Sequence, residues 1–343
     1  MEIEFINHAS VIFNCGDVKI LTDPWYSGSV FNNGWDLLVE RDIDINSLDF
    51  NYLWFSHEHP DHFSVPDIKK ISDEKKKDIT VLFQKTPDQK VAEFCRNLGF
   101  RVKELDALRE YKIGRHSEVS ITCAPCHGYD SWLKVASGGK TVLNINDCRV
   151  ETVDEVLELK AALGKIDVLM TQYSYANWVG NTNDYEAAQI SRDKVFSKND
   201  NQIKYFQPEY VIPFASFSWF SHEENSHCNQ YNIGLSEFID RYRDHNIITL
   251  YLGDRWKVGE TRDCTSAVES WNRAYYQADQ KDARHRGTII KMEDLQRSFS
   301  AMKSKLVEKN DWEAVMTLGD EKILEPCTIY LTDLEKAVTF DIT

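Results

Sequence analysis

The sequence predicts an α/β protein with one large domain over residues 1–258 and an appendage over residues 259–343. Short β-like segments alternate with helix-like segments in the first part, as in proteins with one continuous core. The 343 residues include 42% hydrophobic residues, which is enough for a large core. After about Gly259 the pattern changes to two long amphipathic stretches and two short β-like runs.

The strand-like segments are short runs of β-branched and aromatic residues that stop at turn residues. We expect strands over residues 2–6, 11–14, 18–22, 52–55, 80–83, 119–123, 141–145, 167–170, 210–214 and 247–252. We expect helices over residues 66–72, 88–98 and 153–163, and the last two end at Gly99 and Gly164, which suit a helix C-terminus. In the appendage we expect helices over 265–278 and 292–309 and strands over 328–331 and 337–342, and we interpret it as a packing or dimerisation element.

Charge and cysteine content narrow the classes of partner. The formal net charge of -15 repels phosphate backbones, so we expect no extended nucleic-acid partner. The opening residues have no basic segment before an apolar run, and no stretch reaches the length of a membrane span, so we expect a cytoplasmic protein without a membrane partner. The eight scattered cysteines are interpreted as free thiols.

The strongest motif is the run of residues 53–62, LWFSHEHPDH, directly after a predicted strand. It places His57, His59, Asp61 and His62 within six positions. Imidazole and carboxylate are the side chains that bind zinc, iron or manganese. The pattern therefore predicts a metal site rather than a polar surface loop.

This run resembles the signature of the metallo-β-lactamase superfamily, whose members share an αββα sandwich. The opening motifs His8-Ala9-Ser10, LTDPW at residues 21–25 and Gly34-Trp35 resemble the branch with L-ascorbate-6-phosphate lactonases, N-acyl-phosphatidylethanolamine phospholipase D and CMP-N-acetylneuraminate hydroxylase. The segments PFA at residues 213–215 and TQYS at residues 171–174 are most similar to the hydroxylase. The resemblance covers roughly residues 1–255.

The resemblance implies two divalent metal ions per chain, zinc or iron, with manganese also possible. His57, His59 and His127 would hold the first ion. Asp61, His62 and a late histidine would hold the second, with His222 preferred and His227 as the alternative. Asp147 would bridge the two ions.

Residues around the ligands are expected to support the chemistry. His8 and Asp23 are candidates to orient ligating imidazoles, although Asp23 is also consistent with a turn cap. Asp61 would help to orient the nucleophile. The aromatic residues expected near the ligands are interpreted as a substrate pocket, with ordinary core packing as the alternative. They are Trp132, Tyr173, Tyr175, Trp178 and Trp219.

The run from Cys123 to His127 also matches a C-x-x-C-H haem attachment motif. We reject haem because its attachment normally takes place outside the cytoplasm and because the metal pattern needs His127.

Two enzyme classes follow. The preferred one is a dinuclear-metal hydrolase that uses a bridging hydroxide on a small phosphoester, amide or lactone substrate. The alternative is a non-haem di-iron oxygenase. Because the sequence lacks the C-x-H and C-x-x-H pair of a Rieske module, that oxygenase would need an external reductase. A third interpretation is a binding protein that has kept the fold but has no catalytic activity. The full set of expected metal ligands argues against it.

Overall fold

The structure is a computed structural model that describes residues 1–116, 118–126, 128–177, 179, 182–281, 283–321, 323–331 and 334–342. The described chain falls into two compact units, Met1–His285 and Arg286–Thr343, which are treated separately below. Among the described residues, no helix combines the length and the apolar character needed to cross a lipid bilayer.

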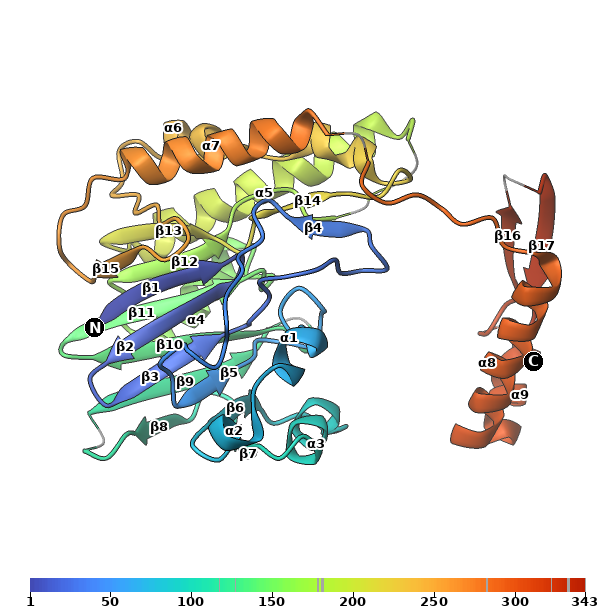
Figure 1. The fold of residues 1–343 in the computed structure, drawn as a ribbon, viewed down its shortest axis with the longest axis horizontal. Coiled ribbons are helices and arrows are strands. Elements are labelled where there is room, and N and C mark those ends of the chain that lie inside the picture. The colour runs from blue at the N-terminus through green and yellow to red at the C-terminus, as the bar shows by residue number, and fades with distance from the viewer. Residues whose placement is uncertain are drawn as a thin grey trace. The chain divides into compact units, whose positions relative to one another are not determined.

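The first unit is built on two mixed β-sheets (Figure 1). One sheet has the order β15-β1-β2-β3-β5-β6-β7, and its strands β3, β5, β6 and β7 run parallel. The bounds are β1 Glu2–Asn7, β2 Ser10–Cys15, β3 Val18–Thr22, β5 Tyr52–Trp54, β6 Thr80–Gln84, β7 Arg101–Leu105 and β15 Arg255–Lys257.

The other sheet has the order β13-β12-β11-β10-β9-β8, and β11, β12 and β13 run parallel. Its strands are β8 Glu110–Ile113, β9 Val119–Pro125, β10 Ser131–Ser137, β11 Lys140–Asn146, β12 Val168–Gln172 and β13 Tyr210–Phe214. A small separate ribbon pairs β4 Trp35–Leu37 with β14 Ser218–Phe220.

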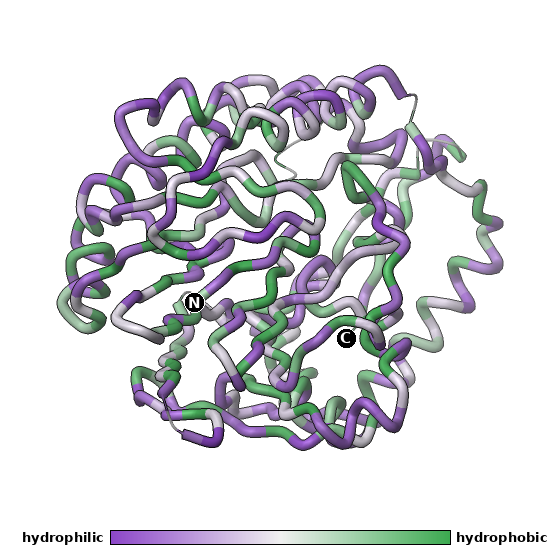
Figure 2. The backbone as a smooth tube through the Cα atoms, turned by 60° about the vertical axis from the view of Figure 1, so that its left-hand side comes forward, coloured by the Kyte–Doolittle hydropathy of each residue, from purple (hydrophilic) through white to green (hydrophobic). Residues whose placement is uncertain are grey.

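Alternation along the strands explains the layers, because successive side chains point to opposite faces of a sheet. On β2, Val11 and Phe13 join the core between the two sheets, whereas Ile12 joins the core beneath α1 and α3. Figure 2 shows hydrophobic and hydrophilic residues interspersed along the backbone. The outer face of the second sheet is covered by α4 and α5, through Val156 and Phe206.

The helices of the first unit are short except for α4, α5 and α7. They are α1 Val65–Lys69, α2 Asp73–Lys76, α3 Lys90–Asn97, α4 Val153–Leu163, α5 Tyr185–Phe206, η1 Ser226–Tyr231, α6 Leu235–Arg241 and α7 Thr265–Asp279. Figure 1 shows α5, α6 and α7 on one side of the sheets and α1, α2 and α3 on the opposite side. The predicted α/β class and the αββα sandwich are therefore confirmed.

Two expectations differ from the structure. Residues 247–252 do not form a regular strand, since only Ile247 makes an isolated bridge to Val211 of β13. The expected boundary after residue 258 falls before α7, but the first unit continues to His285. The physical reason is that Trp271 of α7 is fully buried and stacks on Phe217, with ring centroids 4.1 Å apart.

The second unit contains helices α8 Met292–Lys309 and α9 Trp312–Asp320 and the hairpin of β16 Cys327–Leu331 with β17 Lys336–Phe340. Neither of its helices has a buried residue among those described. Its apolar side chains are held mainly by edge-on contacts such as Phe299 with Phe340.

Candidate metal centre

The loop after β5 brings the motif residues together. Between Ser56 and Phe63 the chain turns tightly, because the backbone N–H groups of His62 and Phe63 both donate to the carbonyl of His59. His57 and His62 are buried at 1% exposure, whereas His59 is exposed to solvent. The loop thus contributes two buried histidines, His57 and His62, and one solvent-exposed histidine, His59.

Among the described residues, three groups of side chains could each hold a metal ion. They are His57, His59 and Asp130; His57, His62 and Asp147; and His8, Asp61 and His62. The seven residues together are called the His–Asp cluster below. His57 and His62 each belong to two groups, so the groups are continuous with one another.

Distances within the cluster place Asp147 between the two halves. Its Oδ2 lies 3.7 Å from Nε2 of His57 and 3.6 Å from Nε2 of His62. Oδ2 of Asp61 lies 3.4 Å from Nε2 of His62 and 3.6 Å from Nε2 of His8. Oδ1 of Asp130 lies 3.8 Å from Nε2 of His57. His57 and His59 also contact each other directly, since Nε2 of His57 lies 2.8 Å from Nδ1 of His59. The carboxylate–imidazole spacings of 3.4 to 3.8 Å suit side chains that converge on shared points.

Unpaired buried atoms indicate that the cluster fits metal ions. Among the described residues, both ring nitrogens of His8, Oδ1 of Asp61 and Oδ1 of Asp147 are buried without a hydrogen-bond partner. Buried polar atoms without partners are rare in folded proteins and call for an explanation. Imidazole nitrogens and carboxylate oxygens with free lone pairs are suitable ligands for divalent cations.

A layer behind the ligands holds them in place. Asp23 accepts hydrogen bonds from the backbone N–H of Ser56 at 2.8 Å and from its hydroxyl at 2.7 Å. The same carboxylate lies 3.0 Å from Nδ1 of His62, and Oγ of Ser56 lies 2.9 Å from Nδ1 of His57. The outward-facing nitrogens of two cluster histidines are thus occupied, which leaves each Nε2 directed into the cluster.

The charges of the cluster shift its pKa values. Although burial opposes the charged form, Asp147 and Asp61 raise the pKa of His62 to about 10. Burial also works against ionisation of Asp61 and Asp147, but the neighbouring histidines hold both carboxyl pKa values below normal. Burial lowers the pKa of His8. Burial raises the pKa of Asp130. The lowered pKa values of Asp61 and Asp147 favour their ionised forms, which metal ligands require.

The backbone is strained where strands end at the cluster. His8 follows β1, Asp23 follows β3, Asn146 ends β11 and Ala215 follows β13, with φ values of 38°, 33°, 55° and 46°. Non-glycine residues rarely adopt this left-handed region, and such strain concentrates at functional sites. The backbone N–H of Ala215 also donates to the carbonyl of His8, which joins the two sheets at this edge.

The structure places the other sequence candidates as follows. His127 and Trp178 lie outside the described residues. His222 and His227 belong to none of the metal-competent groups among the described residues, so the preference for His222 is not supported. Nδ1 of His222 instead accepts a hydrogen bond from the backbone N–H of Glu224.

The expected aromatic pocket is also corrected. Trp132, Tyr173, Tyr175 and Trp219 are between 0% and 4% exposed and pack in hydrophobic clusters, so they belong to the core. The exposed aromatic rings near the motif are Phe31, whose ring centroid lies 6.0 Å from that of His59, and Tyr129.

Sequence reasoning also missed Asp130 as a ligand candidate and gave His8 only a supporting role. Asp130 stands three residues after the expected ligand His127, and this spacing was the available signal. His8 reaches the cluster because the turn between β1 and β2 lies at the same sheet edge, which spacing along the chain does not reveal.

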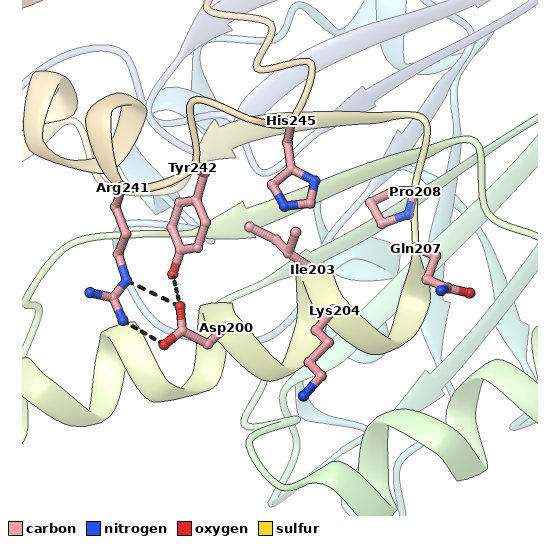
Figure 3. Close-up of a pocket in the computed structure, with 8 residues that line it drawn as sticks. All are labelled: Asp200, Ile203, Lys204, Gln207, Pro208, Arg241, Tyr242 and His245. Atoms are coloured by element: carbon pink, nitrogen blue, oxygen red, sulfur yellow. Dashed lines mark hydrogen bonds and ion pairs between the residues drawn. The ribbon is translucent and has the colours of Figure 1, made fainter.

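A groove of about 820 Å³ lies elsewhere on the first unit, along the C-terminal half of α5 (Figure 3). It is lined by Asp200, Ile203, Lys204, Gln207, Pro208, Arg241, Tyr242 and His245. Asp200 is already held by two bonds from Arg241, at 3.1 and 2.5 Å, and one from Tyr242, at 2.8 Å. None of its lining residues belongs to the His–Asp cluster, so the groove is separate from the metal-competent groups.

Comparison with known proteins identifies the family of this chain. A family model described as a beta-lactamase superfamily domain matches residues 2–195. A Mycobacterium tuberculosis protein named as a Rieske 2Fe-2S iron–sulfur protein is 28% identical over 71% of this chain and 51% of its own length. The cytidine monophosphate-N-acetylneuraminic acid hydroxylase of Cricetulus griseus is 25% identical over 68% of this chain and 43% of its own length. The chain thus spans about half the length of these relatives.

Solved structures show the same fold at low sequence identity. The isothiocyanate hydrolase from Delia radicum gut bacteria aligns with a TM-score of 0.53 and 15% identity, over 76% of this chain and 100% of its own. CmlA, a diiron β-hydroxylase from Streptomyces venezuelae, aligns with a TM-score of 0.52 and 17% identity, over 75% of this chain and 54% of its own. The fold is therefore shared by hydrolases and by hydroxylases.

Proposed function

Because the chain belongs to the metallo-β-lactamase superfamily, we propose that its first unit is a dinuclear metal enzyme that uses iron and dioxygen to hydroxylate a small molecule. The observation that carries this proposal is the composition of the three groups in the His–Asp cluster. Each group combines two histidines with one aspartate. Two histidines and one carboxylate with open positions form the ligand set typical of non-haem iron oxygenases.

The proposed ligand assignment follows the distances. His57, His59 and Asp130 would hold one ion, together with His127 if the family resemblance is followed. His8, Asp61 and His62 would hold the other. Asp147 would serve both, since its carboxylate lies within 4 Å of His57 and of His62.

When bound, a pair of iron ions would supply dioxygen activation at this site. The protein's own residues keep the ligands ready for that chemistry. Asp23 and Ser56 fix the ring orientation of His62 and His57 through the hydrogen bonds described above. The ring of Phe31 stands beside the exposed ring of His59, with centroids 6.0 Å apart.

The sequence relatives support the oxygenase over the hydrolase that the sequence alone favoured. Hydroxylases of CMP-N-acetylneuraminic acid and Rieske-type proteins share 24 to 28% identity with two thirds or more of this chain. These 343 residues contain no C-x-H and C-x-x-H pair, so we propose that the electrons come from a donor group outside them.

Hydrolysis is the second candidate, and the same cluster supports it. A set made only of imidazole and carboxylate also suits zinc and needs no redox partner. In that case Asp61, which is almost fully buried next to His8 and His62, would orient the attacking water.

One experiment distinguishes the oxygenase from the hydrolase. The cells are grown with both iron and zinc, and the protein is purified without added metal. The oxygenase should contain iron, give a Mössbauer signal of a coupled iron pair, and consume dioxygen after anaerobic reduction with dithionite. Asp147→Ala should lose this oxygen uptake. Protein that takes up only zinc and cleaves p-nitrophenyl acetate without oxygen would contradict the oxygenase and support the hydrolase.

A further inference from the structure

Helix α5 carries a buried lysine, Lys198, whose ammonium group has few partners among the described residues. Its side chain is only 6% exposed, and it lies among buried polar neighbours on the same helix face. One neighbour, Gln202, is used by the fold, since it donates to the carbonyl of Val150 at 2.9 Å and accepts from Thr171 at 2.7 Å. Removing an ammonium group from water is costly unless it is paired, so lysine is rarely buried.

Lys198 has very little pairing among the described residues. Its Nζ donates one hydrogen bond, to Oε1 of Gln172 at 3.2 Å, and no ion pair joins it to a described carboxylate. An ammonium group carries three protons, so two remain for a further acceptor. Gln172 turns its oxygen toward Lys198, which leaves its own amide N–H groups as donors.

The position of this pair is at the His–Asp cluster. Gln172 ends β12 and Asp147 follows β11, and these two strands are parallel neighbours. The carboxyl ends of parallel strands form the edge where α/β proteins bind ligands. Burial lowers the pKa of Lys198 to about 8, and the negative charge of Asp147 opposes this shift.

This edge is accessible to solvent. The Asp147 side chain is 20% exposed, and Gln172 is half-buried. A small molecule bound at Asp147 would therefore lie next to the strand end that carries Gln172, the hydrogen-bond partner of Lys198.

We propose that Lys198 and Gln172 bind an oxyanion, a carboxylate or phosphate group of the substrate, beside the dinuclear centre. This inference rests on the proposed function, because without bound cations Asp61, Asp130 and Asp147 would repel an anion. Donation from an ammonium to an oxyanion gives the short, charge-assisted hydrogen bonds that fix a substrate in one orientation. The substrate class is then a small anionic molecule.

The competing explanation is that Lys198 only balances the charge of Asp147. A balancing lysine supports metal retention but makes no contact with a bound anion. Metal content and anion binding therefore have to be measured on the same samples.

The test uses full-length protein loaded with iron(II) under anaerobic conditions and titrates inorganic phosphate and acetate by calorimetry. Lys198→Met is compared with Lys204→Met, an exposed lysine on the same helix that Figure 3 shows at the separate groove. We expect Lys198→Met to keep its iron and to weaken binding of the better anion about tenfold or more, and Lys204→Met to bind as the wild type does. The tighter of the two probes distinguishes phosphate from carboxylate.

Unchanged anion binding in Lys198→Met with full iron content would overturn the inference and leave the proposed function intact. Loss of iron in this variant alone would assign Lys198 the charge-balancing role and also overturn the inference. If wild-type protein takes up no metal, the proposed function fails first, and elemental analysis shows this before any titration. Should Lys198→Met not fold, Gln172→Leu at the half-buried strand end is expected to weaken the same binding severalfold.

Discussion

Oδ2 of Asp23 lies 3.0 Å from Nδ1 of His62, and both side chains are almost completely buried. The two residues come from neighbouring parallel strands, because Asp23 follows β3 and His62 lies in the loop after β5. The backbone N–H of Asp23 also donates to Trp54, which continues the strand pairing up to the carboxylate. The sheet itself therefore positions the group that orients His62.

Asp23→Asn should weaken metal binding about 10- to 100-fold, because it removes the charge that holds the His62 ring with Nε2 facing the cluster. A competition titration against a fluorescent chelator measures this affinity. The matched control is Asp49→Asn, since the Asp49 side chain is 79% exposed and lies outside the cluster. Equal affinities for the Asp23 and Asp49 variants would refute the orienting role.

His8→Ala should reduce the metal content from about two ions to about one ion per chain, because His8 completes the group with Asp61 and His62. His222→Ala should keep about two ions per chain, since His222 lies outside all three groups of described residues. Elemental analysis of both variants gives the answer. If His8→Ala kept two ions per chain and His222→Ala kept one, His222 rather than His8 would be the metal ligand.

The metal-free protein should lose stability as the pH rises from 6.5 to 8. Asp147 and Asp61 raise the pKa of His62 from its ordinary 6.5 to about 10, so protonated His62 stabilises the fold fully below pH 6.5. That contribution is progressively lost as the pH rises through the folded pKa, by about 1 to 2 kcal/mol up to pH 8. Above pH 8, deprotonation of Lys198, whose pKa burial lowers to about 8, increases stability and offsets the loss from His62. The predicted decrease therefore applies between pH 6.5 and 8.

Urea unfolding of chelator-treated protein measures this pH dependence. His62→Gln, which cannot be protonated, should remove most of the slope. A wild-type stability that stays constant or rises between pH 6.5 and 8 would show that His62 is not protonated in the metal-free fold.

Trp271→Ala should lower the free energy of unfolding of the first unit by about 3 to 5 kcal/mol, because it opens a cavity in the core. Tyr276→Ala on the same helix is the control, since Tyr276 is 66% exposed and should change stability by about 0.5 kcal/mol or less. Thermal or urea unfolding measures both. A small effect of Trp271→Ala would mean that the compact unit ends near residue 258.

Local signals were sufficient to predict the motif loop and most strands. The run from His57 to His62 directly follows a strand. Because these ligands are adjacent in the sequence, a single loop brings them together, and no contact with a distant segment is needed. Asp147, which follows β11, was expected only from the resemblance to the metallo-β-lactamase superfamily.

The features that the sequence did not predict depend on contacts between segments that are distant in the chain. His8 joins Asp61 because two strands of one sheet end at the same edge, which spacing along the chain does not reveal. Helix α5 was not predicted because its buried face includes Lys198, Asn199 and Gln202, which hide the apolar periodicity of a helix.

Elemental analysis of native protein, purified without added metal or chelator, tests the central claim most directly. The account predicts about two ions per chain, mainly iron, and a larger loss of metal in Asp147→Ala than in the exposed Asp49→Asn, because Asp147 serves both positions. Protein that contains no metal and takes up neither iron, zinc nor manganese on addition would contradict it.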